Sequence, residues 1–356
     1  MIRRYIRSYL SRHDQNGLHE AKNRSEQKYL VNHDYPEITD EELKQIQEAW
    51  PYMNLTKKDL TWSRIYKKKR GFSPYFIGSW QTHLLRQALN PYAQLSSLEN
   101  KALCDVYFPL LPFPRAYVRR LQGVYYDVNM SILSELEAVD VLLEKQSYVI
   151  KPAFGTMRGQ GVNRIQLKNE REIDVCTVRN SFEEQESDFI AQEVLLQHPD
   201  VAALNPSSLN CCRVTTIYID GHFGYSTIIK FGRRNSNVDN WHSSYFGGVS
   251  ATGLLLGDAF DYSLNRTEKT DFGQVLKGMQ LPCFKEMIGF VEQAHKKYFP
   301  NCGVIGWDVF VDNNNQVRII EANLTCPAFV GEQLASGTFF EPFREEINNR
   351  MKRQLK

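Results

Sequence analysis

The sequence is poor in the features by which cysteine and histidine chemistry is usually recognised. Its seven cysteines form an odd set, and no two of them stand in a CxxC spacing. Neither a disulfide framework nor a structural zinc site is therefore expected. The adjacent Cys211 and Cys212 would point to opposite faces of a strand, and we interpret them as packing residues in a reducing cytoplasm. The eight histidines include no HExxH pair, and no serine or thiol nucleophile has a recognisable triad context.

The sequence also lacks segments that would direct it to a membrane or a nucleic acid. No run approaches about eighteen apolar residues, and the start "MIRRYIRSYLSRHD" has no apolar signal-peptide core. We therefore predict a cytoplasmic protein. The formal net charge is only +2, which gives no general attraction to polyanions. The basic tetrad "KKKR" at 67–70 stands without a nucleic-acid-binding motif, and it predicts a solvated turn.

What the chain does have is a mixture of helical and strand patterns, typical of an α+β or α/β protein. Its 356 residues suggest two or three domains. Apolar residues within 2–10 predict a basic amphipathic helix, which either docks on its own protein or makes peripheral contact with the inner face of a membrane. Thr39 is the predicted N-cap of a second helix. The other predicted elements are a proline-punctuated entry into a strand at 110–118, strands at 146–153 and 188–197, a hairpin at 211–234, and helices at 284–298 and 341–355.

The stretch "GWDVFVDNNNQVRIIEAN", residues 306–323, sets two carboxylates against each other. A two-residue turn at Asn314–Asn315 places Asp308 opposite Glu321. Like charges that face each other across a ladder destabilise it. With Asn323 on the same face, however, the side chains offer the hard oxygen ligands that suit Mg²⁺ carrying a nucleotide phosphate. A register shifted by one residue would instead leave both acids in solvent, and the stretch alone leaves both alternatives open.

A lysine and three glycines form a second pattern that could bind phosphate. Lys151 ends an apolar strand, and Gly155, Gly159 and Gly161 follow in the next loop. A glycine-rich loop can turn backbone N–H groups toward phosphate oxygens while a nearby lysine adds positive charge. The spacing matches neither a Walker A loop nor the GxGxxG turn of a Rossmann domain. Taken alone, it favours a hairpin loop whose glycines supply positive φ angles.

The strand that ends near residue 197 carries two polar side chains among apolar ones. Gln192 and Glu193 lie within "FIAQEVLLQ", and a buried acid there needs partners. One interpretation is a site for adenine and ribose between two lobes, with the backbone of Val194 and Leu195 contacting the edge of the base. The alternative is an edge strand whose polar side chains meet solvent, and the strand alone favours it.

Arg213 and Lys230 are predicted to meet on one face of a hairpin. Counting outward from a turn at Asp220–Gly221 places both side chains on the same side of the sheet. Two cations there would attract an anion such as a transferring phosphoryl group, and a solvated sheet face is the alternative. Asn210 directly precedes the first strand. The polar, glycine-rich segment 233–253 predicts a long loop, either a lid or substrate contact or a disordered segment.

Taken in order, the stretches VIKP, GQGV, QE, LNPSSLNCCRV, GWDV and EAN resemble the ATP-grasp superfamily. The resemblance is closest to its sugar-transfer-associated group, which is found with polysaccharide biosynthesis genes. It implies an α+β ATP-grasp fold in which two α+β lobes clasp a nucleotide. The implied parts are a mainly helical N-terminal region at 1–94, a pre-ATP-grasp segment at 95–145, a small lobe at 146–200, and a large lobe with the metal site at 201–356.

The resemblance also implies roles for the candidate residues. Arg213 would contact the γ-phosphate or an acyl phosphate, and Lys230 on the same face is the second catalytic candidate. The implied metal ligands, for Mg²⁺ or alternatively Mn²⁺, are Asp308, Glu321 and Asn323. The implied ATP-binding residues are Lys101, Lys151, Gly155, Gly159, Gly161, Gln192, Glu193, Val194, Leu195 and Asn210. Many members carry aspartate near Asn210, and Cys326, after the metal ligands, has no implied role.

Three functional hypotheses remain open at this point. In the first, an ADP-forming carboxylate–amine ligase lets a substrate carboxylate attack the γ-phosphorus of ATP, and an amine then displaces phosphate from the acyl phosphate. By resemblance its small-molecule substrates are an amino acid and a sugar acid or amino sugar of a surface polysaccharide such as a capsule. The second hypothesis is a kinase-like phosphotransferase. The third is a non-catalytic nucleotide-binding assembly protein, against which the full set of Lys151, Arg213, Asp308, Glu321 and Asn323 argues.

Overall fold

The structure is a computed structural model, and the residues that it describes are 19–20, 26, 29–30, 34–90, 92–154, 161–234, 243–325 and 327–354. The helix predicted within 2–10, the glycines Gly155 and Gly159, and Cys326 lie outside the described residues. Within the described part, two antiparallel sheets and the helices around them form the α+β fold that we predicted. No helix described there is long and apolar enough to cross a membrane.

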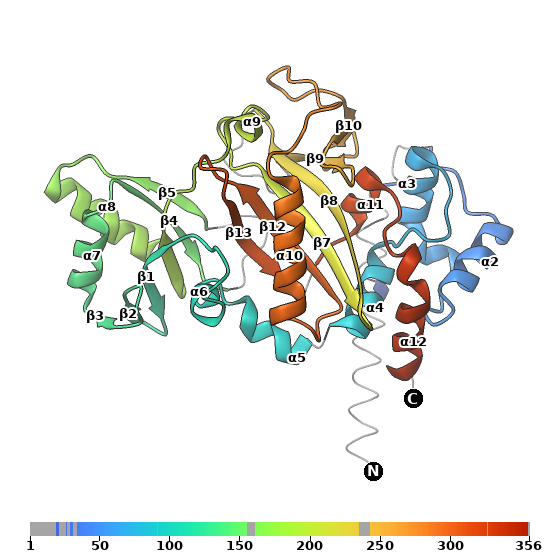
Figure 1. Cartoon of the computed structure of the whole chain (residues 1–356), viewed down its shortest axis with the longest axis horizontal. Coiled ribbons are helices and arrows are strands. Elements are labelled where there is room, and N and C mark those ends of the chain that lie inside the picture. The colour runs from blue at the N-terminus through green and yellow to red at the C-terminus, as the bar shows by residue number, and fades with distance from the viewer. Residues whose placement is uncertain are drawn as a thin grey trace, which may run out of the picture.

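The smaller sheet has six strands in the order β3-β2-β1-β6-β4-β5 and forms the lobe at the left of Figure 1. Its strands are β1 (Ala116–Leu121), β2 (Val124–Tyr126), β3 (Ile132–Leu133), β4 (Ser147–Pro152), β5 (Asn163–Gln166) and β6 (Phe189–Gln192). Helices α7 (Glu135–Leu143) and α8 (Arg171–Glu183) pack against it over a core that includes Val139, Val178 and Phe189. The border predicted between residues 145 and 146 falls inside this sheet, because β1–β3 precede it and β4–β6 follow it.

The larger sheet has seven strands in the order β11-β10-β9-β8-β7-β12-β13. Its strands are β7 (Cys211–Ile219), β8 (His222–Gly232), β9 (Ser244–Val249), β10 (Leu255–Phe260), β11 (Arg266–Thr267), β12 (Val304–Val311) and β13 (Val317–Asn323). The amphipathic helix α10 (Phe284–Tyr298) lies across one face, where Met287 and Val291 pack with Val214 and Trp307. Figure 1 shows this helix in front of the sheet.

Helices from both ends of the chain cover the opposite face of the large sheet. Ile217 and Val304 on that face pack with Leu85, Phe329 and Ile347 of the surrounding helical segments. The helices on this side of the sheet are α2 (Asp40–Ala49), α3 (Thr61–Arg70), α4 (Ser79–Leu89), α11 (Val330–Ser336) and α12 (Arg344–Gln354), with the short η1 (Lys57–Asp59) and η3 (Glu341–Phe343). Helix α2 begins after the predicted N-cap Thr39, whose side chain forms a capping box with Glu42.

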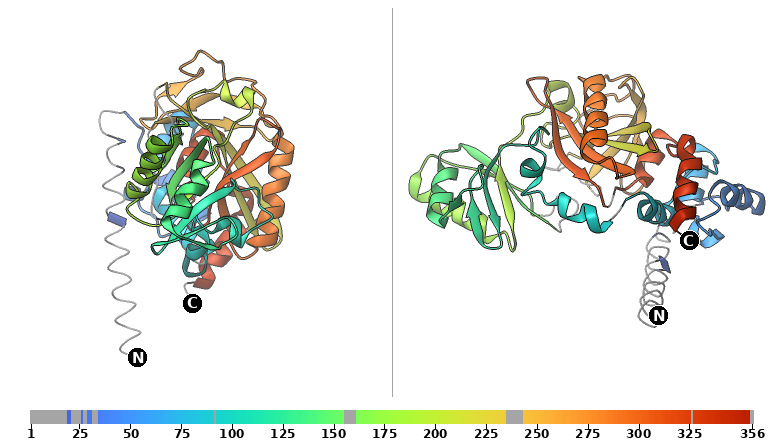
Figure 2. Two further views of the ribbon diagram at one scale, coloured as in Figure 1. Left: turned by 90° about the vertical axis from the view of Figure 1, so that its left-hand side faces the viewer. Right: turned by 60° about the horizontal axis from the view of Figure 1, so that its bottom comes forward.

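Short helical segments connect the N-terminal helices to the small lobe. They are α5 (Tyr92–Leu95), η2 (Ser96–Glu99) and α6 (Cys104–Tyr107), and α9 (Pro199–Ala202) lies on the return path to the large sheet. The right-hand view of Figure 2 shows the small lobe to one side of the large sheet, with the α5–α6 segment between them. Residues 99–105 are therefore in a position to contribute to a site between the lobes.

The register of the β12–β13 hairpin corrects one step of our prediction and keeps its result. Asp308 pairs with Glu321, as predicted. The two-residue turn would also pair Val311 with Arg318, but the structure pairs Val311 with Val317. The loop between the strands contains three residues, 313–315, because the backbone N–H of Asp312 donates to Gln316 and the side chain of Asp312 accepts from the N–H groups of Asn314 and Gln316. A bulge beside Asp308 then inserts one residue into β13 and restores the predicted pairing of the acids.

Two other sequence predictions are wrong, and both concern polar stretches. The basic tetrad 67–70 is the last turn of α3, not a solvated turn, because Lys67 pairs with Glu42 at 2.8 Å and Arg70 donates to backbone carbonyls of α11. The segment 233–253 is not one long loop, since residues 244–249 form the fully buried strand β9. In both cases tertiary partners outweigh the local composition.

Candidate active site between the two sheets

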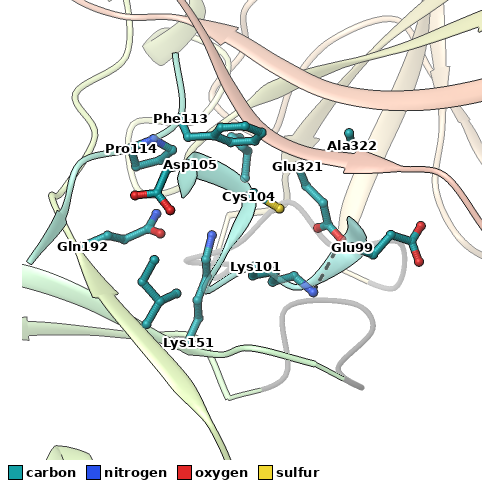
Figure 3. A pocket seen from close by; sticks show the side chains of 12 residues that line it. Glu99, Lys101, Cys104, Asp105, Phe113, Pro114, Lys151, Gln192, Glu321 and Ala322 are labelled. Atoms are coloured by element: carbon teal, nitrogen blue, oxygen red, sulfur yellow. Dashed lines mark ion pairs between the residues drawn. The ribbon is translucent and has the colours of Figure 1, made fainter. Parts of the chain in front are cut away.

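A pocket lies between the two sheets and encloses about 370 Å³, including space that is open to solvent. Four parts of the chain form it: the connecting segment 99–105, residues 113–114 ahead of β1, strands β4 and β6 of the small sheet, and strand β13 of the large sheet. Its lining residues are Glu99, Lys101, Cys104, Asp105, Phe113, Pro114, Lys151, Ile190, Gln192, Ile320, Glu321 and Ala322. Figure 3 shows Lys101, Lys151 and Glu321 around a common space, whereas the carboxylate of Glu99 points away from it.

Lys151 supplies a buried positive charge to this pocket. It lies near the end of β4, as predicted, and only 8% of the residue is exposed. Burial lowers its pKa to about 8, although Glu321 nearby favours the charged form. The side chain extends toward Cys104 and Asp105 in Figure 3. Because a pKa of about 8 keeps most of the ammonium group protonated at neutral pH, Lys151 can pair with an anionic group that enters the pocket.

Lys101 and Glu321 form an ion pair across the pocket, with 3.4 Å between Nζ and Oε1. The backbone N–H of Lys101 donates to the carbonyl of Ala153, which ties the connecting segment to the end of β4. Glu99 is tied to the other lobe, since its carboxylate accepts hydrogen bonds from Leu324 and Thr325. Segment 99–105 is thus anchored to both sheets. Its acids carry no sequence signal that would have identified them as pocket residues.

The two predicted catalytic cations meet at one carboxylate. Arg213 and Lys230 project from the same face of the β7–β8 hairpin, whose turn is Asp220–Gly221 as predicted. Arg213 makes a two-pronged contact with Asp308 at 2.8 and 2.9 Å, and Lys230 reaches the same carboxylate at 3.1 Å. Burial alone would raise the pKa of Asp308, but the two cations outweigh burial and hold that pKa well below its usual range.

Glu332 of α11 is a further acid at this cluster, and no pattern in the sequence indicates it. One carboxylate oxygen accepts a hydrogen bond from the Thr215 hydroxyl, and the other lies 3.9 Å from Arg213 Nη1. Burial raises the pKa of Glu332 to about 7, although Arg213 and Thr215 act in the opposite direction. Near neutral pH this carboxyl group can therefore take up or release a proton.

The predicted metal ligands offer suitable atoms but little spare charge. Asp308 and Glu321 face each other, and Asn323 uses its amide nitrogen to donate to Gly306, so its oxygen remains available as a ligand. Each carboxylate is already paired with lysine or arginine. Among the described residues no cluster of three or more His, Cys, Asp or Glu side chains could hold a metal ion. The donor set fits a cation that arrives with phosphate oxygens of its own better than a free cation.

The predicted adenine-site residues lie at the end of β6. This strand is central, paired with β1 and β4, so the edge-strand alternative is excluded. Gln192 lines the pocket and is buried. Glu193 accepts hydrogen bonds from the Arg115 N–H and the Arg318 guanidinium, and so links the two sheets. In the described part of the chain, Val194 and Leu195 use no backbone group in a hydrogen bond, which leaves those groups available for a ligand.

Two further candidates have structural roles in this arrangement. Gly161 has a φ of +72°, and a Cβ there would lie 2.8 Å from the Pro152 ring, so glycine is required beside β4. Asn210 is fully buried, and its amide group bonds to Val201, Asn205 and Ser208. These contacts use the polar atoms of Asn210 for loop structure, and its contact with a nucleotide stays a prediction.

Comparison with protein families gave one match. A family model described as sugar-transfer associated ATP-grasp matches residues 81–349. The matched range includes both sheets and every predicted site residue. A search of the curated proteins gave no match.

Several solved structures are similar to this chain, at low identity. The D-alanine–D-alanine ligase of Helicobacter pylori aligns over 74% of this chain and 61% of its own length, with 14% identity and a TM-score of 0.40. The L-amino acid ligase of Bacillus licheniformis aligns over 74% of this chain and 50% of its own length, with 13% identity and a TM-score of 0.40. D-cycloserine synthetase DcsG aligns over 89% of this chain and 95% of its own length, with 15% identity and a TM-score of 0.42. The chain thus spans 61% and 50% of the length of the first two of these proteins.

Proposed function

The chain belongs to the sugar-transfer associated ATP-grasp family, and on this premise we propose that it is an ATP- and Mg²⁺-dependent ligase. The reaction joins a carboxylate to an amine and releases ADP and phosphate. One observation carries the proposal: four cationic and two anionic side chains from both lobes converge where the two sheets meet. They are Lys101, Lys151, Arg213, Lys230, Asp308 and Glu321.

The charges divide into two neighbouring groups with different tasks. Lys151 and Lys101 belong to the pocket that also contains Gln192 and the apolar side chains of Phe113 and Ile320. An apolar space with a few polar groups and buried cations suits a nucleotide base with its first phosphates. Arg213 and Lys230 lie on the large sheet beside Asp308, and they suit the terminal phosphoryl group, whose negative charge spreads over its oxygens during transfer.

The ion pairs of Asp308 and Glu321 explain how these two negatively charged side chains can face each other. Asp308 and Glu321 would repel each other across the ladder, but each is neutralised by cations. The phosphates of a bound nucleotide would compete for these cations, and the two carboxylates with Asn323 would then hold Mg²⁺. The ion supplies positive charge that draws electron density from the transferring phosphoryl group. The protein residues hold the phosphates and exclude water around them.

The chemistry requires positioning more than acid–base catalysis in its first step. The substrate carboxylate attacks the γ-phosphorus of ATP, the bond to the β-phosphate oxygen breaks, and an acyl phosphate and ADP result. In the second step an amine nitrogen attacks the acyl carbon, and phosphate leaves as the amide forms. Arg213 and Lys230 remain beside the phosphoryl group in both steps and stabilise its charge.

The substrates are proposed as a class, from the sugar-transfer association of the family. We expect small molecules, an acid and an amine of which at least one is an amino acid and the other is linked to a sugar. The product would serve a surface polysaccharide. We further propose that the reaction takes place in the cytoplasm, and contact with the inner face of a membrane through residues 2–10 stays a prediction.

The test is ³¹P NMR of the protein with ATP and Mg²⁺ against a panel that pairs amino acids with uronic acids and amino sugars. The proposal predicts ADP and inorganic phosphate in equal amounts, formed only when both an acid and an amine are present. A stable new phosphoester signal would support phosphotransfer instead. Absence of turnover with every pair, together with the absence of nucleotide-dependent stabilisation in a thermal melt, would contradict an ATP-dependent activity.

A further inference from the structure

The carboxylate of Glu332 is buried but only half satisfied. The residue is 6% exposed. Its Oε2 accepts a hydrogen bond from Thr215, whereas Oε1 lies 3.9 Å from Arg213 Nη1, which is beyond hydrogen-bonding distance. Among the described residues no other group donates to Oε1. Oε1 does not belong to the fully buried unpartnered side-chain atoms of the described residues, so a bound group can reach it and donate a hydrogen bond to it.

Helix α11 holds Glu332 in place by contacts that have no part in the ion-pair cluster. Gln333 exchanges hydrogen bonds with Ile77 through its side chain, and the Tyr66 hydroxyl donates to the carbonyl of Val330. Arg70 donates to the carbonyl of Ala335 at 2.9 Å. The N-terminal helices and α11 thus fix the carboxylate on the sheet face that carries Arg213. A side chain held this firmly is preorganised, because little freedom remains to be lost on binding.

Glu332 shares Arg213 with Asp308, which places it next to the proposed phosphoryl site. Arg213 contacts Asp308 through Nε and Nη2 and turns Nη1 toward Glu332. A group bound at Glu332 Oε1 would therefore lie on the far side of Arg213 from Asp308. In the proposed reaction, the amine that attacks the acyl phosphate would approach close to this position, because Arg213 would also contact the phosphoryl group.

From this geometry we propose that Glu332 binds the ammonium group of the acceptor substrate and takes its proton before the amine attacks the acyl phosphate. The inference rests on the proposed ligase function and deepens it. It specifies the acceptor as a primary amine that arrives protonated, and it assigns a catalytic base that the sequence did not indicate. The N–H groups of the ammonium would donate to Oε1 of Glu332, to which none of the described residues donates.

The proton balance of the step is complete. The ammonium group transfers one proton to the Glu332 carboxylate and becomes a free amine. The amine nitrogen forms a bond to the acyl carbon, the bond from that carbon to the phosphate oxygen breaks, and the second proton leaves with the phosphate as hydrogen phosphate. One ammonium, one acyl phosphate and one carboxylate thus give one amide, one hydrogen phosphate and one carboxylic acid, with the total charge unchanged. No oxidant or further reactant is required.

Charged and titratable groups from several elements face Glu332 and tune its proton affinity. Arg213 on β7 and Lys230 on β8 favour the ionised form, and Asp308 on β12 disfavours it. Burial raises the pKa of Tyr66 on α3, and the nearby carboxylates of Glu26 and Glu332 raise it further. Burial is the largest influence and brings the pKa of Glu332 to about 7. A base with a pKa near the working pH is effective at removing a proton.

The test compares two nucleophiles in the wild type and in Glu332→Gln. Hydroxylamine is largely unprotonated at neutral pH, so it can trap an acyl phosphate as a hydroxamate without help from a base. The acids are the amino acids and uronic acids of the panel above, and the amines are its amino acids and amino sugars. In Glu332→Gln we expect hydroxamate formation within about twofold of wild type and amide formation reduced at least about 100-fold, the size of a general-base contribution. Raising the pH should narrow the amide deficit, because more acceptor is already deprotonated.

The outcomes separate failure of the inference from failure of the proposed function. Equal loss of hydroxamate and amide in Glu332→Gln, or loss of neither, would overturn the role of Glu332 while the ligase activity stands. Absence of hydroxamate with every acid in the wild type would overturn the ligase proposal and the inference with it. A thermal melt with ADP and Mg²⁺ checks that the variant folds. Glu345→Gln, at an exposed glutamate of α12, is the matched control and should leave both products unchanged.

Discussion

Asp308 and Glu321 face each other across the β12–β13 ladder, yet their carboxylates pair with cations from different parts of the molecule. Arg213 and Lys230 of the large sheet contact Asp308, whereas Lys101 of the connecting segment contacts Glu321. Two facing acids are thus made compatible without a metal ion. The arrangement also means that a dication alone gains little, because cations already neutralise its ligands. A nucleotide that draws these cations to its phosphates would release both acids together.

Removal of one of these acids should abolish metal-dependent turnover and leave the fold intact. Glu321 is partly exposed and has a single ion pair at 3.4 Å, and such pairs contribute about 1 kcal/mol or less to stability. We expect Glu321→Ala to lower ADP release at least about 100-fold, the size of the loss when one group that stabilises transition-state charge is removed. Coupled ADP assays at several Mg²⁺ concentrations, with urea unfolding in parallel, measure both effects. Glu183→Ala, at an exposed acid of α8, is the control, and activity near wild type in Glu321→Ala would contradict the metal-site prediction.

Because Asp308 pairs with Arg213, the free energy of unfolding should decrease at acidic pH. The cations hold the pKa of Asp308 below its unfolded value of 3.8, so the unfolded state binds more protons and stability is lost as the pH falls below about 4. Asp308→Asn leaves Arg213 and Lys230 without their shared anion, and we expect it to cost about 3 kcal/mol at pH 7.

The measurement is urea unfolding of the wild type and Asp308→Asn between about pH 7 and pH 3. The difference in unfolding free energy between them should shrink toward the acid end, because wild-type Asp308 loses its advantage there. Arg213→Met should be destabilised by a similar amount at pH 7, since it leaves Asp308 with Lys230 alone. A difference that does not change with pH would show that Asp308 is not held ionised by these cations.

Local signals were sufficient for one of the two hairpins that form the site. An Asp–Gly turn allows positive φ at both positions, and Asp220 and Gly221 adopt φ values of 50° and 90°. That turn fixes the register of β7–β8 and brings Arg213 and Lys230 together. In β12–β13 the predicted two-residue turn is a three-residue loop, and the sequence does not predict the bulge, so two errors cancel at Asp308. A bulge depends on the packing of both strands, which the sequence of the turn does not encode.

What the sequence could not predict depends on how distant elements dock. Glu332 reaches the site only because Tyr66 and Gln333 hold α11 against the N-terminal helices, and no periodicity within α11 indicates that contact. Lys101 is brought to Glu321 by the connecting segment between the lobes. The basic tetrad was misjudged for the same reason, because its partners are α2 and α11 rather than sequence neighbours. Such contacts are decided by the assembled fold.

The buried charge of Lys151 should make nucleotide affinity and stability respond oppositely to pH. Its folded pKa is lowered from 10.5 to about 8, so between these values the unfolded state binds more protons and wild-type stability rises with pH. Lys151→Met removes the free-energy cost of burying a charged ammonium group, and we expect the variant to be more stable than wild type at pH 7 by on the order of 3 kcal/mol. The same variant should bind ADP more weakly, because the phosphates lose a buried cation.

Isothermal titration with Mg²⁺ and ADP from about pH 7 to pH 9, with thermal melts over the same range, measures the two responses. Wild-type affinity for ADP should fall as the pH rises through 8, where Lys151 loses its proton, and the affinity of Lys151→Met should change much less. Equal pH dependence in both proteins would mean that Lys151 does not contact the phosphates. If Lys151→Met were less stable than wild type, the interactions of the Lys151 ammonium group in the wild type would outweigh the free-energy cost of its burial.

The last prediction concerns the space that Arg213 needs. Its guanidinium lies over Gly306 of β12, where a Cβ would be 3.3 Å from Nη1 and 3.3 Å from the Pro327 Cβ. Such contacts are tight, and Arg213 cannot shift without loosening its two-pronged contact with Asp308. We therefore expect Gly306→Ala to lower hydroxamate formation by about 10-fold or more while changing the unfolding free energy by about 1 kcal/mol or less. Gly289→Ala on α10, where a Cβ meets open space, should leave activity unchanged and raise stability by about 0.5–1 kcal/mol. Full activity in Gly306→Ala would show that the position of Arg213 is not what limits transfer of the phosphoryl group.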